Sequence, residues 1–108
     1  MASQERINAL KVFLDKDPDD SFSSYALALE YNGLGETDKA IATLRELLKR
    51  DPKYVAAYHQ LGQLYSKINK TREAKRYYRK GIEAAEEAND AHAKREMEEA
   101  LEEIEDEW

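Results

Sequence analysis

The sequence contains a segment that recurs 34 residues further along the chain. At that offset the turn, aliphatic, aromatic and small residues keep their places: Asp17-Pro18 recurs as Asp51-Pro52, Leu27 as Leu61, Tyr31 as Tyr65, Thr37 as Thr71 and Ala40 as Ala74, with near-matches of Ala28 to Gly62 and Leu44 to Tyr78. A fixed period of this length is typical of proteins that stack units of two helices. We therefore expect a helical repeat protein.

Each unit divides into two segments whose apolar residues lie three and four apart, the spacing of one face of an α-helix. The predicted helices are residues 21–33 and 37–50 in the first unit and 55–67 and 71–87 in the second, flanked by residues 3–16 and 90–107. No alternation of apolar and polar residues predicts a strand. The expected fold class is all-α with about six helices, and whether residues 71–107 form one helix or two stays open.

The joints between the paired helices carry matching residues in the two units. Gly35 and Asn69 occupy equivalent positions, and both residue types tolerate a left-handed backbone. The two Asp-Pro pairs are expected to end the preceding helices, because proline lacks an N–H and disfavours helix in the residue before it. The predicted N-cap residues are Ser3, Thr37 and Thr71.

These positions resemble the tetratricopeptide repeat family, whose 34-residue units form a helix, a turn and a second helix. The family pattern is a large residue, Leu-Gly, Tyr, a small residue, an aromatic, a small residue and a closing proline. At these pattern positions the second unit has Tyr58, Leu61-Gly62, Tyr65, Ala74, Tyr78 and Gly81, with Glu86 in place of the closing proline. The first unit matches more loosely, with Ser24, Leu27-Ala28, Tyr31, Ala40, Leu44, Leu47 and Pro52.

The resemblance implies a single domain over residues 1–108, folded as a right-handed superhelix of antiparallel helix pairs. Its expected parts are an N-terminal helix (3–16), repeats over 21–54 and 55–88, and a C-terminal capping helix (90–107). It also implies a reason for Gly62, which costs its helix about 1 kcal/mol relative to alanine. The two helices of a unit cross closely in this family, and a side chain at that position would hold them apart.

The resemblance further implies a concave groove that binds a peptide or helix of a partner protein. Its lining residues would be Phe22, Tyr25, Leu29, Asn32, Ala56, His59, Gln63 and Ser66, with Met97 from the last helix. The residues support part of this independently, since Phe22, Tyr25 and Leu29 give helix 21–33 a second apolar face. The alternative is that Phe22 and Tyr25 pack on the N-terminal helix.

Some members of the family bind a C-terminal carboxylate with a clamp of lysine, asparagine and arginine. Here Tyr25, Leu29 and Gln60 stand at clamp positions, so that clamp is absent. An apolar or amphipathic helix is therefore the expected ligand rather than a charged tail. Self-assembly through the groove or the C-terminal helix, where Trp108 stands at the end, is the alternative function.

The formal net charge is −6, which disfavours nucleic acid and anionic membrane surfaces as partners. A basic cluster contains Lys67, Lys70, Arg72, Lys75, Arg76, Arg79 and Lys80, and an acidic run over 96–107 follows it. We interpret both as solvated faces that attract one another, in preference to a docking site for an acidic partner.

The sequence contains no motif for catalysis or for a cofactor. His59 and His92 stand apart, with no HExxH spacing, and the pair His92 and Glu96 offers only an adventitious metal site. The chain has no cysteine, which suits a reducing compartment, so a cytoplasmic location is expected. No stretch approaches the roughly 18 apolar residues of a membrane span. We expect a protein that is not an enzyme and binds no cofactor or metal.

Overall fold

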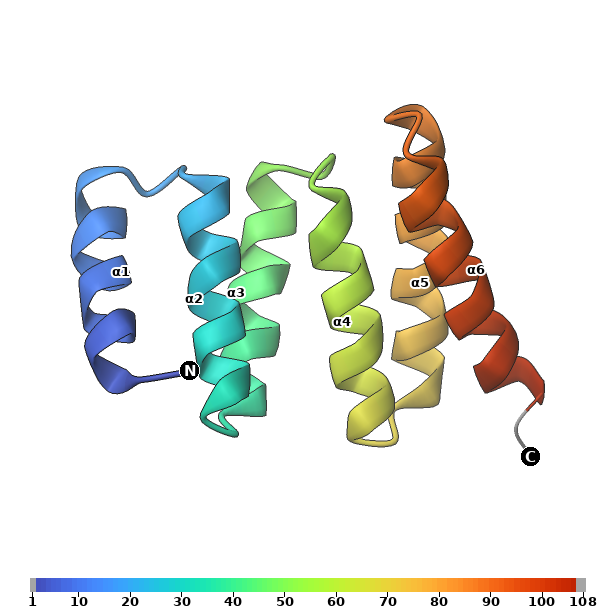
Figure 1. Cartoon of the computed structure of the whole chain (residues 1–108), viewed down its shortest axis with the longest axis horizontal. Coiled ribbons are helices and arrows are strands. Elements are labelled where there is room, and N and C mark those ends of the chain that lie inside the picture. The colour runs from blue at the N-terminus through green and yellow to red at the C-terminus, as the bar shows by residue number, and fades with distance from the viewer. Residues whose placement is uncertain (1, 107–108) are drawn as a thin grey trace. The chain divides into compact units, whose positions relative to one another are not determined.

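The computed structural model describes residues 2–106, which form six helices and no strand. The helices are α1 (Gln4–Lys16), α2 (Ser21–Gly33), α3 (Thr37–Arg50), α4 (Val55–Lys67), α5 (Thr71–Glu87) and α6 (Ala91–Asp106), as labelled in Figure 1. Helices α1 to α3 belong to a first compact unit, Met1–Asp51, and α4 to α6 to a second, Pro52–Trp108. The predicted all-α fold is confirmed, and Trp108 lies outside the described residues.

Three turns between paired helices share one backbone geometry. Gly35, Asn69 and Asn89 have positive φ angles of 79°, 63° and 57°. After each of them, the next residue donates its N–H to a carbonyl five residues earlier, with N–O distances of 2.8 to 2.9 Å. This is the hydrogen bond of a Schellman turn, which satisfies the last carbonyls of a helix. The left-handed prediction is confirmed, and Asn89 separates α5 from α6.

The predicted N-caps have mixed outcomes. Ser3 caps α1, because its hydroxyl accepts a hydrogen bond from the N–H of Arg6 at 3.1 Å. The prediction for Thr37 and Thr71 is wrong, since each is the first residue inside its helix. In both units the N-cap is the residue whose N–H closes the Schellman turn, Glu36 or Lys70, and this residue lies immediately before the threonine.

Substitution of Gly35 tests the turn geometry. Gly35→Ala is expected to lower the free energy of unfolding by about 1 kcal/mol, because a Cβ disfavours a positive φ. No atom lies within 4 Å of the Cβ position, so the cost is conformational rather than steric. Gly35→Asn is the control and is expected to cost less, since Asn69 adopts the same geometry in the second unit. Thermal unfolding measures both, and equal losses would contradict this explanation.

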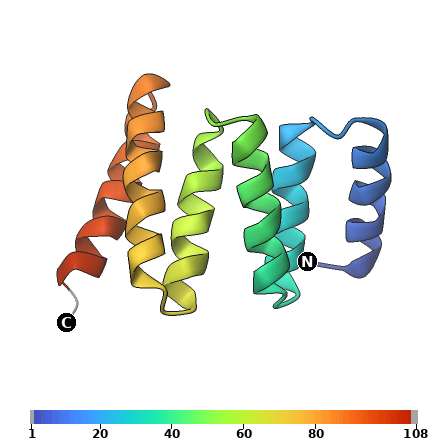
Figure 2. The same ribbon diagram turned by 180° about the vertical axis from the view of Figure 1, so that it is seen from behind.

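In the first unit, α2 packs antiparallel on α1 and on α3 (Figure 2). The apolar stripes meet where Ile7, Leu44 and Leu47 are at most 1% exposed. Small residues allow close contact here, since Ala28 and Ala40 are also at most 1% exposed. The same spacing that predicted the helices therefore also supplies the core.

In the second unit, Gly62 of α4 lies directly against the ring of Tyr78 on α5. A Cβ on Gly62 would stand 2.6 Å from both Cδ1 and Cζ of that ring. Gly81 of α5 is equally crowded, because a Cβ there would stand 2.7 Å from Cβ of Tyr58 and against the sulfur of Met97. The close crossing expected at Gly62 is confirmed, and it explains why the helix contains a glycine.

Candidate protein-binding surface

Helix α2 is held in its unit by polar contacts to α1. The carboxylate of Glu30 is 11% exposed and accepts a hydrogen bond from the N–H of Ser3 at 2.9 Å. The same carboxylate pairs with Nε of Arg6 at 3.4 Å. A nearly buried carboxylate with two donors is satisfied, and removal of either donor would leave a buried charge.

The start of α2 is held by polar contacts of its own. Asp20 caps the helix, accepting hydrogen bonds from the hydroxyl of Ser23 at 2.8 Å and from its N–H at 3.2 Å. These bonds favour the carboxylate and lower the pKa of Asp20. Towards α3, Ser21 donates to Asp51 at 2.7 Å, and Arg50 donates to the hydroxyl of Ser24 at 3.0 Å.

With its inner face packed, α2 presents a second, partly apolar face. Phe22 is 72% exposed and Leu29 is 38% exposed, while Tyr25 and Asn32 are half-buried between and beyond them. All four lie three or four residues apart, so they follow one side of the helix. The alternative that Phe22 packs on the N-terminal helix is wrong, because most of its ring lies in solvent.

Asn32 adds a polar group to the end of this face. Its side-chain oxygen is buried and accepts no hydrogen bond from any residue that the structure describes. A buried acceptor without a donor costs about 1 to 3 kcal/mol. Because this oxygen is sealed from solvent, it adds a local cost to the fold and does not offer an acceptor to a bound segment.

The corresponding residues of α4 lie in the second unit. Ala56, Gln63 and Ser66 are exposed, and His59 is half-buried. The ring of His59 packs edge-on against that of Tyr78, with centroids 6.0 Å apart, and lies 3.4 Å from the amide nitrogen of Gln63. This face is polar, in contrast to the face of α2.

Met97 does not belong to an accessible surface. It is 0% exposed and its sulfur lies against Gly81, so it is a core residue of the second unit. The apolar stripe of α6 faces α5, and Met97 is the residue of that stripe that inserts most deeply. The sequence-based assignment of Met97 to a binding groove is therefore corrected by its burial.

Sequence reasoning missed the exposed face of α1. The helical spacing of Ile7, Leu10 and Phe13 or Leu14 indicates one apolar face for this helix, and of the last two Leu14 is half-buried while Phe13 is 63% exposed. The neighbouring Val12 is 56% exposed. The periodic pattern could have signalled two apolar faces, since Val12 and Phe13 do not both lie on the side of Ile7. Which of the two faces is covered depends on neighbouring helices, and among residues 2–106 the main packing partner of α1 is α2.

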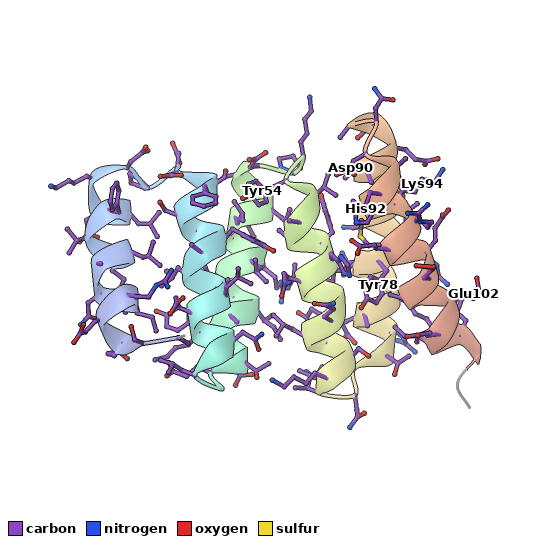
Figure 3. The ribbon with its side chains drawn as sticks, in the orientation of Figure 1. Tyr54, Tyr78, Asp90, His92, Lys94 and Glu102 are labelled. Atoms are coloured by element: carbon purple, nitrogen blue, oxygen red, sulfur yellow. The ribbon has the colours of Figure 1, made fainter. Side chains whose placement is uncertain are left out.

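Some of the oppositely charged side chains of α5 and α6 form ion pairs. Arg79 pairs with Glu105 at 2.7 Å and Lys94 with Glu86 at 2.9 Å. The hydrogen bond that Lys94 donates to Glu86 is the main reason why the pKa of Lys94 is raised. Figure 3 shows Lys94 and Asp90 at the start of α6. The interpretation that the basic cluster and the acidic run attract one another is supported by the pair Arg79–Glu105, whereas Lys94 and Glu86 belong to neither set.

Burial also affects the chemistry of Tyr78, whose pKa is raised by burial and by the charge of Glu103. Figure 3 places Tyr78 on α5, inside the second unit, so its hydroxyl is a structural group. Within residues 2–106 no three side chains of the metal-binding types gather at one point. No helix in the described part of the chain is long and apolar enough to cross a membrane.

Comparison with known proteins identifies the family. Tetratricopeptide repeat models match residues 21–64 and residues 55–88. The solution structure of a tetratricopeptide repeat domain protein from Salinibacter ruber is 37% identical, covers 82% of this chain and 90% of that one, and superposes with a TM-score of 0.78. This chain belongs to the tetratricopeptide repeat family. The fold and the family that the 34-residue period predicted are thereby confirmed.

Other tetratricopeptide repeat (TPR) structures share the fold at lower identity. The TPR2B domain of yeast Sti1, solved as a complex with pHsp70, is 18% identical, with 93% of this chain and 80% of that chain covered and a TM-score of 0.86. The TPR domain of Sgt2 from Aspergillus fumigatus is 28% identical over 92% of this chain and 63% of that chain, with a TM-score of 0.77. A search among curated proteins finds no match.

Proposed function

We propose that this TPR chain is a non-catalytic protein-binding module that contacts its partner through the exposed face of α2. TPR domains generally serve protein–protein interaction, and the Sti1 domain was solved as a complex with pHsp70. The observation that carries the proposal is that Phe22 and Leu29 lie on the same side of α2 with much of their apolar surface in solvent. Burial of a side chain of this kind contributes about 1.5 to 3 kcal/mol.

The proposed ligand is an apolar or amphipathic segment of a protein. Tyr25 and Leu29 stand where a carboxylate-binding TPR domain would carry charged or amide side chains. The exposed apolar surface of Phe22 and Leu29 favours aliphatic or aromatic side chains in the partner segment. The polar face of α4, with Ala56, His59, Gln63 and Ser66, is proposed as a separate contact surface of the second unit.

A double substitution tests the α2 face. Phe22→Ser/Leu29→Ser is expected to weaken capture of the partner at least tenfold, because two apolar contacts are lost. The measurement is a pull-down followed by titration of the purified partner that it recovers. Leu34→Ser is the control, since it removes a large apolar side chain that is 42% exposed and lies outside the α2 face. Equal binding by wild type and double variant, with unchanged circular dichroism, would contradict the proposal.

Self-association is the alternative proposal, and the exposed apolar side chains of α1 and α2 favour it. Sedimentation velocity at several concentrations decides between the two. A dimer that dissociates in Phe22→Ser/Leu29→Ser would assign the α2 face to a second copy. We place the module in the cytoplasm in this proposal, because a chain without cysteine gains nothing from an oxidising compartment.

A further inference from the structure

Most cations of the basic cluster on α5 and the turn before it are not engaged by the acidic run. Arg79 pairs with Glu105 at 2.7 Å, which accounts for one member of the cluster. Five others are exposed and form no ion pair with any residue from 2 to 106, namely Lys67, Lys70, Arg72, Arg76 and Lys80. Attraction between α5 and α6 therefore explains only part of the cluster.

Three of these five cations form a line along α5. Arg72, Arg76 and Lys80 lie four residues apart, so successive charges stand about 6 Å apart along one side of the helix. We call these three residues the basic stripe. The guanidinium of Arg76 lies over the ring of Tyr77, 5.8 Å from the ring centroid, and its donors remain available to a ligand. The other two cations of the five lie just before the stripe in the sequence.

The basic stripe is electrostatically unfavourable for the helix that carries it. Like charges at i and i+4 destabilise a helix. The positive end of the helix dipole adds to the repulsion, because Arg72 lies in the first turn and the N-cap Lys70 makes no side-chain capping bond. Glu73 and Glu83 each lie three residues from a cation of the stripe, but neither forms an ion pair within the described residues.

The first unit shows that the fold does not need these cations. One repeat earlier, α3 has two carboxylates and an alanine at the stripe positions, namely Asp38, Glu46 and Ala42. The N-cap of α3 is Glu36, and Glu36 and Glu46 each pair with a lysine three residues further along, at 3.1 and 3.3 Å. Because the same positions of the repeat form a helix with the opposite charge, the stripe indicates a role other than folding.

We propose that the basic stripe of α5 binds an acidic segment of another protein. Carboxylates four residues apart on a helical segment repeat about every 6 Å, as the cations of the stripe do. The two arginines of the stripe can each bind a carboxylate through two parallel hydrogen bonds. This surface lies on a different helix from the α2 face, so the inference goes beyond the proposed function and does not depend on it.

The C-terminal half of α5 favours a protein segment over other polyanions. The side of the helix that carries the stripe continues into Glu83 and Glu87, which are exposed. A nucleic acid or an anionic membrane is negative throughout and is repelled by these two carboxylates and by the net charge of −6. A protein segment can follow its acidic residues with basic ones and so match both halves of the helix.

The test uses the full chain and a fluorescein-labelled peptide probe. The probe is a helical, alanine-rich peptide with three glutamates at four-residue spacing, followed on the same side by two lysines. Fluorescence anisotropy at low ionic strength is expected to show saturable binding that weakens severalfold as salt is added. Arg72→Asp/Lys80→Glu, which installs the residues of the first unit, is expected to weaken binding at least tenfold.

Arg45→Asp/Lys53→Glu is the matched control, because it changes the net charge equally at two exposed cations outside the stripe. This control is expected to bind the probe within about twofold of the wild-type protein. Phe22→Ser/Leu29→Ser is also expected to bind the probe normally, so failure of this inference is distinguishable from failure of the proposal for the α2 face.

The stripe variant Arg72→Asp/Lys80→Glu is also expected to unfold at a higher temperature than the wild-type protein. Arg76 then has an acidic neighbour four residues away on each side, and the first turn of α5 gains a carboxylate. A stripe variant that unfolds at a lower temperature would contradict the inference, because the cations would then support the fold.

Three binding results would overturn the inference: no saturable binding at low salt, equal binding by the folded stripe variant, or an equal loss in the matched control. A labelled DNA duplex that binds more tightly than the peptide would assign the stripe to phosphates. Self-association that the stripe variant abolishes would assign it to a second copy. Either assignment would also overturn the inference.

Discussion

Gly62→Ala is expected to lower the free energy of unfolding by about 1 to 2 kcal/mol, the usual cost of overpacking less the gain in helix propensity. The new methyl group would overlap the ring of Tyr78, which is 3% exposed and has little room to move. Thermal and urea unfolding give the change. Ser66→Ala on the exposed side of the same helix is the control and is expected to be neutral or slightly stabilising.

The first unit suggests how the overlap is relieved. It carries Ala28 and Leu44 at the positions of Gly62 and Tyr78, so one unit pairs alanine with leucine and the other pairs glycine with tyrosine. In a Tyr78→Leu background, Gly62→Ala is therefore expected to stabilise the protein by up to about 1 kcal/mol. The change in the free energy of unfolding reverses its sign because the Tyr78 ring that the new methyl group would overlap is absent from this background. If Gly62→Ala stabilises the unaltered protein as well, the close-crossing explanation is wrong.

Met97→Ala is expected to cost about 3 kcal/mol, the range found when large buried side chains are truncated. Met97 is fully buried against Gly81, whereas the other apolar residues of α6 from Ala93 to Ile104 are only half-buried. Loss of this one contact should therefore release α6 from α5. Hydrogen exchange of the α6 amides is expected to accelerate before the rest of the second unit opens.

The exposed His92→Ala is the control for Met97→Ala, since it lies on the same helix and its contact with Glu96 is a surface pair. Unfolding and exchange should match the wild-type protein. A Met97→Ala variant that keeps its stability but loses binding of a partner would contradict the assignment of Met97 to the core. That result would restore the original sequence-based prediction.

The fold could be predicted from the sequence because equivalent residues recur in both units and favour the same local structure in each. The two helices of each unit begin and end where the 34-residue register predicts, since the turn residues Gly35 and Asn69 impose the same backbone geometry. The prediction failed at Thr37 and Thr71 for a local reason. The turn preceding each helix is one residue shorter than a threonine N-cap would require, so the threonine lies in the first turn instead of capping it.

The candidate site was only partly predictable. Phe22 and Leu29 were assigned to an accessible face from their spacing, and their exposure agrees with that assignment. Met97 was assigned to the groove, although it lies in the core of the second unit. The reason is that periodicity shows that a helix has an apolar side but does not show whether another helix covers it.

The sequence alone is sufficient to predict the family, the helix boundaries and the close crossing at Gly62, because these features depend on neighbours within one 34-residue unit. Exposure depends on packing between helices distant in the chain. The depth of Met97 beneath Gly81, the burial of Glu30 beside Arg6 and the exposure of Phe13 emerged only once the helices were placed together.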